Sequence, residues 1–207
     1  MFLTGFAVGP FAANCYLLGC EKTRRLAVID PGGDARRILE TVDRSSFTVS
    51  SILNTHGHID HVAANEEIRK ATGAPILIAT PDAPMLASPA RQLAGMLLKG
   101  VAGVTADRLL EDGESIEVGE LKLKVLLTPG HTPGSACFLL KGEGLVFSGD
   151  TLFEESVGRT DLPGGSWADM IASIREKLLV LDDKVRVLPG HGPETTIGHE
   201  RRANPFL

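Results

Sequence analysis

The chain has 207 residues, a length that supports one domain with a sizeable core, and no Ser/Gly/Pro-rich stretch divides it, so we expect a single domain over residues 1–207. Its 21 basic and 26 acidic side chains give a net charge of −5 without a long basic run, which argues against a nucleic-acid groove. Three cysteines without a CxxC pair argue against a disulfide framework, and no apolar stretch approaches a membrane span, so we expect a cytoplasmic protein without membrane or nucleic-acid partners.

The first half of the chain alternates apolar runs with helical patterns. Residues 1–18 are apolar, but they lack a basic leader and are broken by Gly5, Gly9 and Pro10, so they predict two strands rather than a signal peptide. Strands are expected at residues 2–8, 14–18, 26–29, 51–53 and 76–78, and helices at residues 34–42, 62–72 and, with interruptions, 82–99.

The second half opens with meandering strands. Two hairpins are expected, one joining residues 115–118 to 121–127 and one joining residues 136–140 to 145–147. Apolar residues then recur at steps of three and four, which predicts a helix with Ser166 as its N-cap and a core-facing stripe: Trp167, Met170, Ile171, Ile174, Leu178 and Leu181. Strands separated by helices in both halves favour an α/β protein in which helices cover two packed sheets.

The segment Thr55–His61 packs three imidazoles and a carboxylate directly after the apolar run Ser51–Leu53. Residues two apart in an extended chain point the same way, so His56 and His58 share one face. Asp60 and His61 follow where a helical pattern begins, and they turn toward the same point. Imidazole nitrogens and carboxylate oxygens suit zinc, iron or manganese, so the segment predicts a metal site.

Three further strand ends place a potential ligand on a turn. His131 follows the apolar run Lys124–Leu127, Asp150 follows Leu145–Phe147, and His191 follows Val185–Leu188. Loops on a rigid sheet are where catalytic residues concentrate, so the repeated order of strand, turn and ligand favours one shared site over scattered structural histidines.

Asp30 also ends a predicted strand, in the turn Asp30–Asp34. We interpret it as a helix N-cap or as a partner that orients a ligand histidine, rather than as a direct ligand. The hydroxyls of Thr55 and Thr128 are expected to support the ligands in the same way. His199 lies beyond the last motif and receives no role in the site.

The motifs resemble those of the metallo-β-lactamase superfamily in its dinuclear hydrolase form, and their order agrees over nearly the whole chain. The chain is most similar to glyoxalase II-like hydrolases (hydroxyacylglutathione hydrolases), particularly the short bacterial type without a C-terminal helical domain. This similarity rests on the segments Gly149–Phe153, Ser156–Gly165 and Pro189–Pro193 and on the ending Asn204–Leu207.

The resemblance implies a four-layer αββα sandwich, in which helices cover two mixed β-sheets and the metal site lies at one end between them. It implies two divalent metal ions, zinc first, with iron and manganese as alternatives. Carried over by position, the first metal is held by His56, His58 and His131, the second by Asp60, His61 and His191, and Asp150 bridges the two.

The implied reaction is hydrolysis of a thioester, S-D-lactoylglutathione or a similar hydroxyacyl-glutathione, by a metal-bridging hydroxide. Metal coordination lowers the pKa of water to about 7, which makes such a nucleophile available near neutral pH. The leaving thiol has a pKa of about 8.5 and departs without a strong acid. Asp60 is the predicted catalytic residue, because it can orient the hydroxide besides binding metal.

Arg159 is the predicted substrate-binding residue, because it occupies about the position of the family's lysine in a Gly-Lys segment. Asp161 falls where a tyrosine is expected, and the chain lacks the helical domain that supplies further glutathione contacts in longer relatives. An ion pair from Arg159 to Asp161 or Glu155 is the structural alternative. Arg201 and Arg202 are further candidates for a carboxylate clamp.

Two other reaction classes are compatible with the motifs. A mononuclear iron persulfide dioxygenase shares the fold, the His56–His61 pattern and a similar Gly-Arg-Thr-Asp run, but that family typically shows Ala-His-Asp where this chain has Pro189–Pro193. A metallohydrolase for another ester-like substrate is the second alternative. A β-lactam ranks below a thioester, because the Asp60 and Arg159 segments resemble the glyoxalase II branch, and a non-catalytic scaffold is disfavoured because every ligand position is filled.

Overall fold

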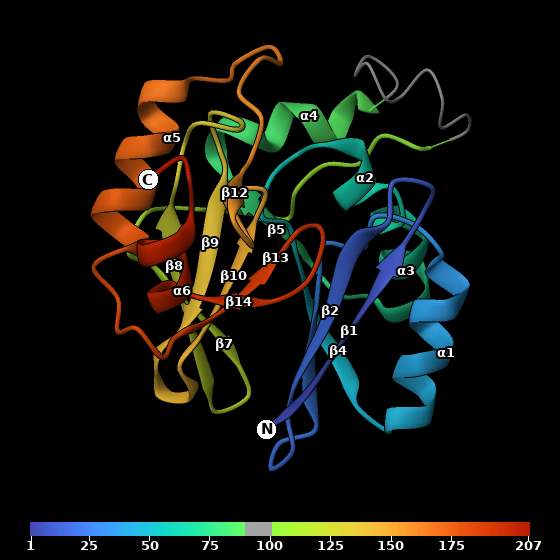
Figure 1. Ribbon diagram of the computed structural model, residues 1–207. Helices are drawn as coiled ribbons and strands as arrows, with labels where there is room; N and C mark the ends of the chain where they lie inside the picture. The colour runs from blue at the N-terminus through green and yellow to red at the C-terminus, as the bar shows by residue number, and fades with distance from the viewer. Residues whose placement is uncertain (90–100) are drawn as a thin grey trace.

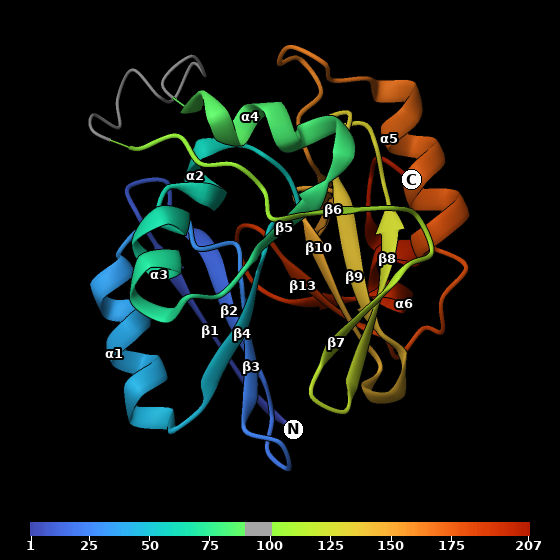
Figure 2. The same ribbon diagram turned by 180° about the vertical axis from the view of Figure 1, so that it is seen from behind.

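The computed structural model describes residues 1–89 and 101–207. Two six-stranded sheets pack face to face, and helices cover the outer face of each (Figure 1, Figure 2). The expected α/β architecture, a four-layer αββα sandwich with two mixed sheets, is confirmed.

The first sheet contains the N-terminal strands in chain order. They are β1 (Phe2–Val8), β2 (Ala13–Cys20), β3 (Arg25–Ile29), β4 (Thr48–Leu53), β5 (Ile76–Ala79) and β6 (Arg108–Leu110). The pairs β1/β2 and β2/β3 are antiparallel, whereas β3, β4, β5 and β6 run parallel to one another. Helical connections make these parallel pairings possible.

The second sheet has the order β14-β13-β10-β9-β8-β7. Its strands are β7 (Ser115–Val118), β8 (Leu121–Leu127), β9 (Ala136–Leu140), β10 (Leu145–Gly149), β13 (Arg186–Pro189) and β14 (Thr195–Thr196). The pair β10/β13 is parallel and the other pairs are antiparallel. A small hairpin of β11 (Leu152–Phe153) and β12 (Ser156–Val157) follows β10.

Helices form the two outer layers. The first sheet is covered by α1 (Ala35–Ser45), α2 (Ile59–Val62), α3 (Asn65–Thr72) and α4 (Ala83–Ala87), the last preceded by a 3₁₀ turn, η1 (Thr80–Asp82). The second is covered by α5 (Trp167–Ser173), which continues as a π-helix, η5 (Ile174–Leu178), and by α6 (Ile197–Ala203). A second 3₁₀ turn, η4 (Lys141–Glu143), links β9 to β10.

Three separate apolar layers hold the sandwich together. Leu53, Phe138 and Phe147 lie in the layer between the sheets. Ile38 of α1 belongs to the layer outside the first sheet, and Met170 of α5 to the layer outside the second. Burial of each such side chain contributes about 1.5–3 kcal/mol, so these layers fix the relative position of the two sheets and hence of the loops at their ends.

One predicted helix is broken at the point where it meets the candidate site. The expected helix 62–72 is wrong at its start, because α2 begins at Ile59 and α3 begins separately at Asn65. The amide of Ala64 donates to the carbonyl of Pro31, 2.9 Å away, rather than continuing the helical hydrogen bonds. The turn after β3 thereby leaves Asp60 and His61 on a short helix of their own.

Other boundaries differ for local reasons. The helix expected over 82–99 ends at Ala87, since Ser88 precedes a proline and leaves the helical region, and its residues 90–99 lie outside the described residues. Ser166 is confirmed as the N-cap of α5, accepting from the Asp169 amide, but the helical path ends at Leu178 rather than Leu181. The sequence patterns did not predict β6, the strands β11 and β12, β14 or α6, which are all short.

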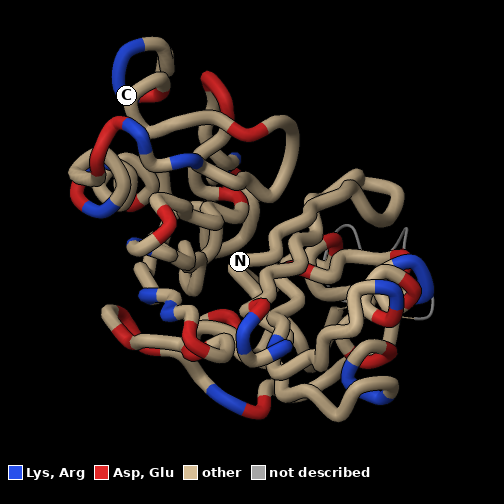
Figure 3. The backbone as a smooth tube through the Cα atoms, turned by 90° about the horizontal axis from the view of Figure 1, so that it is seen from below, with Lys and Arg blue, Asp and Glu red and all other residues tan. Residues whose placement is uncertain are grey.

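Figure 3 shows acidic and basic residues interspersed along the described chain, without a continuous basic stripe. Cys15, Cys20 and Cys137 are free, as their odd number predicted. Over residues 1–89 and 101–207, helices are too short or too polar to cross a bilayer.

Candidate metal centre

The predicted ligands come together on loops at one end of the sandwich. They are His56 and His58 after β4, Asp60 and His61 in α2, His131 after β8, Asp150 after β10 and His191 after β13. Because β10 and β13 are parallel neighbours, with Gly149 opposite Pro189, their carboxyl ends bring Asp150 and His191 to one edge. The two sheets meet here, where the amide of Ala136 donates to the carbonyl of Thr55.

The first group contains the histidines assigned to the first metal: His56, His58 and His131 offer ligand atoms that all lie within 4.8 Å of one another. The ring nitrogens His58 Nδ1 and His131 Nε2 are 2.8 Å apart. The other nitrogen of His131, Nδ1, donates to the carbonyl of Arg159 at 2.7 Å. That bond keeps the proton on Nδ1 and leaves the lone pair of Nε2 facing the group.

The second group contains the ligands assigned to the second metal, with Asp60, His61 and His191 also within 4.8 Å of one another. His191 Nε2 lies 3.3 Å from Asp60 Oδ2 and 3.3 Å from His61 Nε2. The side chains of His191 and Asp60 are 30% and 20% exposed, whereas that of His61 is fully buried. The second group is therefore the side from which a substrate can approach.

Asp150 lies between the two groups. Its Oδ1 is 3.4 Å from His61 Nε2, and its Oδ2 is 3.5 Å from His131 Nε2. Oδ2 is also 3.7 Å from His191 Nε2. A carboxylate with one oxygen toward each group is the arrangement that a bridging ligand requires.

The donor set fits divalent metal ions. His56 Nε2 and Asp150 Oδ1 are buried, and neither has a hydrogen-bond partner within the described part of the chain. A buried polar atom without a hydrogen bond destabilises the folded protein. A buried imidazole nitrogen and a buried carboxylate oxygen that both lack hydrogen bonds, at the centre of a His/Asp cluster, therefore indicate a position for a metal ion. Mixed imidazole and carboxylate ligands accept zinc, iron and manganese.

Asp30 and Thr55 form hydrogen bonds with two of the predicted ligands, His61 and His56. Asp30 Oδ2 accepts from His61 Nδ1 at 3.1 Å and from the Thr55 hydroxyl at 2.6 Å, and Oδ1 accepts from the Thr55 amide. The Thr55 hydroxyl also contacts His56 Nδ1. Asp30 is thus positioned to orient His61, a predicted ligand, which is one of the two roles expected of it. Helix α1 is instead preceded by Asp34.

Thr128 does not take the role expected of it. Its hydroxyl contacts Thr151 Oγ1 and Cys137 Sγ, at 3.0 and 3.3 Å, inside the second sheet's outer layer. Thr128 thus connects β8 to the residue after Asp150, and within residues 1–89 and 101–207 its hydroxyl contacts no predicted ligand histidine.

The turn before His191 requires glycine. A side chain at Gly190 would collide with Asp150 Oδ1 and approach the His61 ring. The glycine therefore lets the backbone of one ligand loop pass directly beside the ligands of the other strands.

Asp82, which the sequence reasoning missed, ties together the loops that carry the first group. It is completely buried at the end of η1. Its carboxylate accepts from the amides of Gly57 and Gly134 and from the hydroxyl of Thr132, at 2.7–2.8 Å. Gly57 lies between His56 and His58, and Thr132 follows His131. A signal existed, since Asp82 follows a strand end just as Asp30 and Asp150 do.

We expect Asp82→Asn to weaken metal binding about 10- to 100-fold, the range for partners that orient ligands from outside the coordination shell. The NH₂ group of asparagine is a donor, so it cannot accept a hydrogen bond from one of the groups that now donate to the Asp82 carboxylate. The two loops then lose part of their shared attachment. Metal affinity measured by competition with a chromogenic chelator tests this.

Glu200 provides a matched control for Asp82. It is likewise fully buried and accepts from three donors, the Thr195 hydroxyl, the Glu155 amide and the Asn204 side chain, but none of these residues is next to a predicted ligand in the sequence. Glu200→Gln should lower the melting temperature without changing metal affinity. Equal loss of metal in both variants would attribute the effect to general destabilisation and contradict the role of Asp82.

The two groups differ in charge without metal. Burial, reinforced by His131, lowers the pKa of His58 to about 4, so this imidazole is neutral at pH 7. Burial also lowers the pKa of His61, but nearby carboxylates, Asp150 foremost, outweigh it and raise this pKa to about 10. Burial also lowers the pKa of His191, but the hydrogen bond that His191 donates to Asp60 and the charges of Asp150 and Asp60 together outweigh burial and raise this pKa.

Metal binding to the second group is therefore expected to release protons at pH 7, whereas binding to the first group is not. Since a proton occupies His61 up to a pH of about 10, affinity at the second group should rise with pH through that range. Calorimetric titration of metal in buffers of different ionisation enthalpy measures the number of protons released on binding. His191→Ala should reduce proton release more than His58→Ala, and equal release would contradict the assignment.

Arg159 and the C-terminal arginines make structural contacts. The guanidinium of Arg159 is exposed and pairs bidentately with Asp161. Arg201 and Arg202 both pair with Asp183, and Arg201 also donates to the carbonyls of the segment 179–181. His199 contacts Glu155, at 3.1 Å. The structure brings the seven predicted ligands together but leaves these three arginines engaged with acidic neighbours.

Comparison with known proteins places this architecture in a family. A family model described as the Metallo-beta-lactamase superfamily matches residues 8–191. The chain therefore belongs to the metallo-β-lactamase superfamily. Hydroxyacylglutathione hydrolase GloC of Haemophilus influenzae is 36% identical over 202 residues, which cover 97% of this chain and 95% of that protein.

Two solved structures are similar over the full length. The BLEG-1 B3 metallo-beta-lactamase has a TM-score of 0.93 at 37% identity, covering 100% of this chain and 99% of that one. TTHA1623 in a di-iron-bound form has a TM-score of 0.86 at 37% identity, covering 100% of both chains. Family membership and the two His/Asp groups together define the chain as a metal-dependent hydrolase with a metallo-β-lactamase fold.

Proposed function

We propose that the protein is a dinuclear hydrolase of thioesters, with S-D-lactoylglutathione or a similar hydroxyacyl-glutathione as substrate. The observation that carries the dinuclear part is the position of Asp150 between the two ligand groups, with one oxygen toward each. The similarity to hydroxyacylglutathione hydrolase GloC supports the substrate class.

His56, His58 and His131 would hold one ion, Asp60, His61 and His191 the other, and Asp150 both. Bound divalent ions would supply a water with a pKa near 7 and polarise the acyl carbonyl. We favour zinc, and the di-iron form of TTHA1623 makes iron the principal alternative. Elemental analysis of protein purified from its native host would decide between them.

The side chains then have separate tasks. Hydrogen bonding from His191 and the charges of the second group hold the pKa of Asp60 below its usual range despite burial, so Asp60 is ionised at neutral pH. An ionised, partly exposed carboxylate can accept a proton from an attacking water and fix its direction. The leaving thiol, with a pKa of about 8.5, needs little help from a general acid.

The direct test is hydrolysis of S-D-lactoylglutathione by purified protein whose metal content has been quantified. Turnover that scales with metal occupancy supports the proposal. A β-lactam assay runs in parallel, because the BLEG-1 structure is named as a B3 metallo-beta-lactamase. Oxygen consumption with glutathione persulfide, observed without thioester turnover in protein holding a single iron, would favour the persulfide dioxygenase alternative instead.

We further propose that Arg159 binds a carboxylate of the substrate, in exchange for its pair with Asp161. Because both partners are exposed, solvent screens the interaction and its contribution is small, so Arg159→Ala should raise KM by about fivefold or less with kcat retained. Metal content should not change, since His131 bonds to the carbonyl of residue 159 and not to its side chain. An unchanged KM would restrict Arg159 to a structural role.

A further inference from the structure

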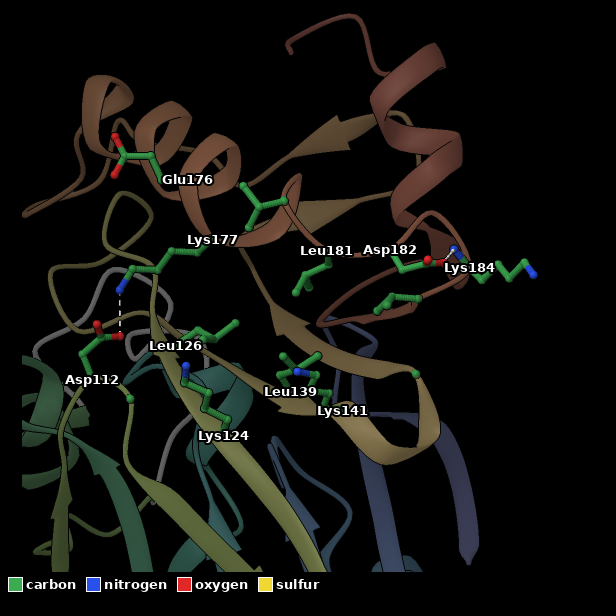
Figure 4. A pocket seen from close by; sticks show the side chains of 14 residues that line it. Asp112, Lys124, Leu126, Leu139, Lys141, Glu176, Lys177, Leu181, Asp182 and Lys184 are labelled. Atoms are coloured by element: carbon green, nitrogen blue, oxygen red, sulfur yellow. Dashed lines mark hydrogen bonds and ion pairs between the residues drawn. The ribbon is translucent and has the colours of Figure 1, made fainter.

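A cavity of about 710 Å³ lies on the outer face of the second sheet, among β8, β9, the end of η5 and the segment 180–185 (Figure 4). None of the predicted metal ligands lines it. Its volume falls within the range of about 300–1,000 Å³ that is typical of small-molecule sites. The hydrolase site does not account for it.

The interior of this cavity is apolar. Leu126 and Leu139 form its floor, from adjacent strands on the outward side of the sheet, and Val185 and Leu181 extend the apolar surface. Val180 stands at the edge and is 69% exposed, a large fraction for an aliphatic side chain. The cavity therefore suits a ligand with an apolar body.

Two lysines give the cavity a positive end. Lys124 is directly opposite Leu139 in the β8/β9 register and therefore stands on the same face as the floor. Lys141, in the turn η4 directly after β9, also lines the cavity. Figure 4 shows both side chains beside Leu126 and Leu139, whereas Glu176 and Lys184 extend away from the floor. Neither Lys124 nor Lys141 forms an ion pair within the described residues.

Asp112, an acidic side chain of the lining, already pairs with another lysine. Asp112 accepts from Lys177 at 2.7 Å and from the Leu127 amide at 2.8 Å. Lys177 belongs to η5, where the chain widens to π-helical geometry, a local feature that occurs frequently at functional sites. Asp112 also interacts electrostatically with Lys124, so one carboxylate faces two ammonium groups. Lys141 adds a third positive charge to the lining, which an anionic ligand would balance.

We propose that this cavity binds an amphipathic carboxylate, with its hydrocarbon chain on Leu126, Leu139 and Leu181 and its carboxylate between Lys124 and Lys141. The apolar floor selects the chain and the lysines select the charge, so medium-chain fatty acids are the ligand class. A cationic amphiphile is repelled, and a short anion such as acetate lacks the apolar contact. This site is independent of the proposed hydrolase function.

The experiment titrates octanoate into the full-length, metal-loaded protein and follows heat by isothermal calorimetry. We expect one octanoate per chain. The double variant K124Q/K141Q should weaken binding about tenfold, the combined loss of two partly exposed charge interactions. Uncharged 1-octanol should bind wild type about as weakly as octanoate binds this double variant.

Two further variants locate the ligand. Lys122→Gln is the matched control, because Lys122 is the next residue of β8 on the same face but lies outside the cavity and pairs with Glu117. It should leave octanoate binding unchanged. Val180→Asp, at an exposed position that tolerates a charge in the folded protein, should weaken binding by placing a carboxylate at the apolar edge.

Two outcomes would overturn the proposal. One is no heat of binding with octanoate at concentrations below its micelle formation. The other is binding that K124Q/K141Q and Val180→Asp leave unchanged, which would place the carboxylate elsewhere, including on the metal ions.

Discussion

Asp150→Ala is expected to lower thioester turnover at least about 1,000-fold and to remove bound metal. The carboxylate reaches both ligand groups, 3.4 Å from His61 Nε2 and 3.5 Å from His131 Nε2, so its loss affects both ions. Charge stabilisation by bound metal is worth several kcal/mol, and each 1.36 kcal/mol corresponds to a factor of ten in rate. Elemental analysis and kcat/KM for S-D-lactoylglutathione, measured on the same preparation, test both parts.

Asp43→Ala serves as the control, because Asp43 is an exposed carboxylate on α1, remote in sequence from every ligand. It should retain metal and activity. If the Asp150→Ala protein kept two ions per chain, this would contradict the bridging role of Asp150, whatever the activity of the variant.

Asp60→Asn is expected to lower turnover about 100-fold or more while changing folding stability little. The substitution keeps the size of the side chain but removes the charge that accepts a proton, and positioned proton acceptors contribute about 10²- to 10⁴-fold to rate. Asp60 is partly exposed, 3.3 Å from His191, and asparagine fills the same space, so the substitution opens no buried cavity. Single-turnover rates of the variant loaded with metal measure the effect.

The comparison must be made at equal metal occupancy, because Asp60 is also a predicted ligand. His191→Ala, which removes a ligand from the same group without removing a carboxylate, reports the cost of weakened metal binding alone. Normal turnover by fully metallated Asp60→Asn would rule out its role in orienting water.

The sequence predicted the strand ends well, and with them most of the candidate site. His131, Asp150 and His191 each follow an apolar run that is long enough to be recognised locally, and the resemblance supplied their grouping. The structure then brought them within a few ångströms of one another, because parallel pairing of β10 and β13 and packing of the two sheets align the strand ends.

What could not be predicted depends on contacts distant in sequence. The break between α2 and α3 arises from a bond between Ala64 and Pro31, and no local propensity encodes it. The strand end before Asp82 is a local signal, but its three donors come from loops 25 to 52 residues away, so the sequence alone does not indicate which loops Asp82 joins. The two-residue strands β11, β12 and β14 are too short to show a period.

The hydrogen bond from His131 to residue 159 has a consequence for how this scaffold can diversify. The acceptor is a main-chain carbonyl, so it survives almost any side chain at that position. The loop that presents Arg159 beside the centre can therefore change its charge and size while the imidazole keeps its orientation. His61 is different, because its partner is the side chain of Asp30. The orientation of His131 therefore does not depend on which side chain stands at position 159, whereas the orientation of His61 depends on the side chain of Asp30.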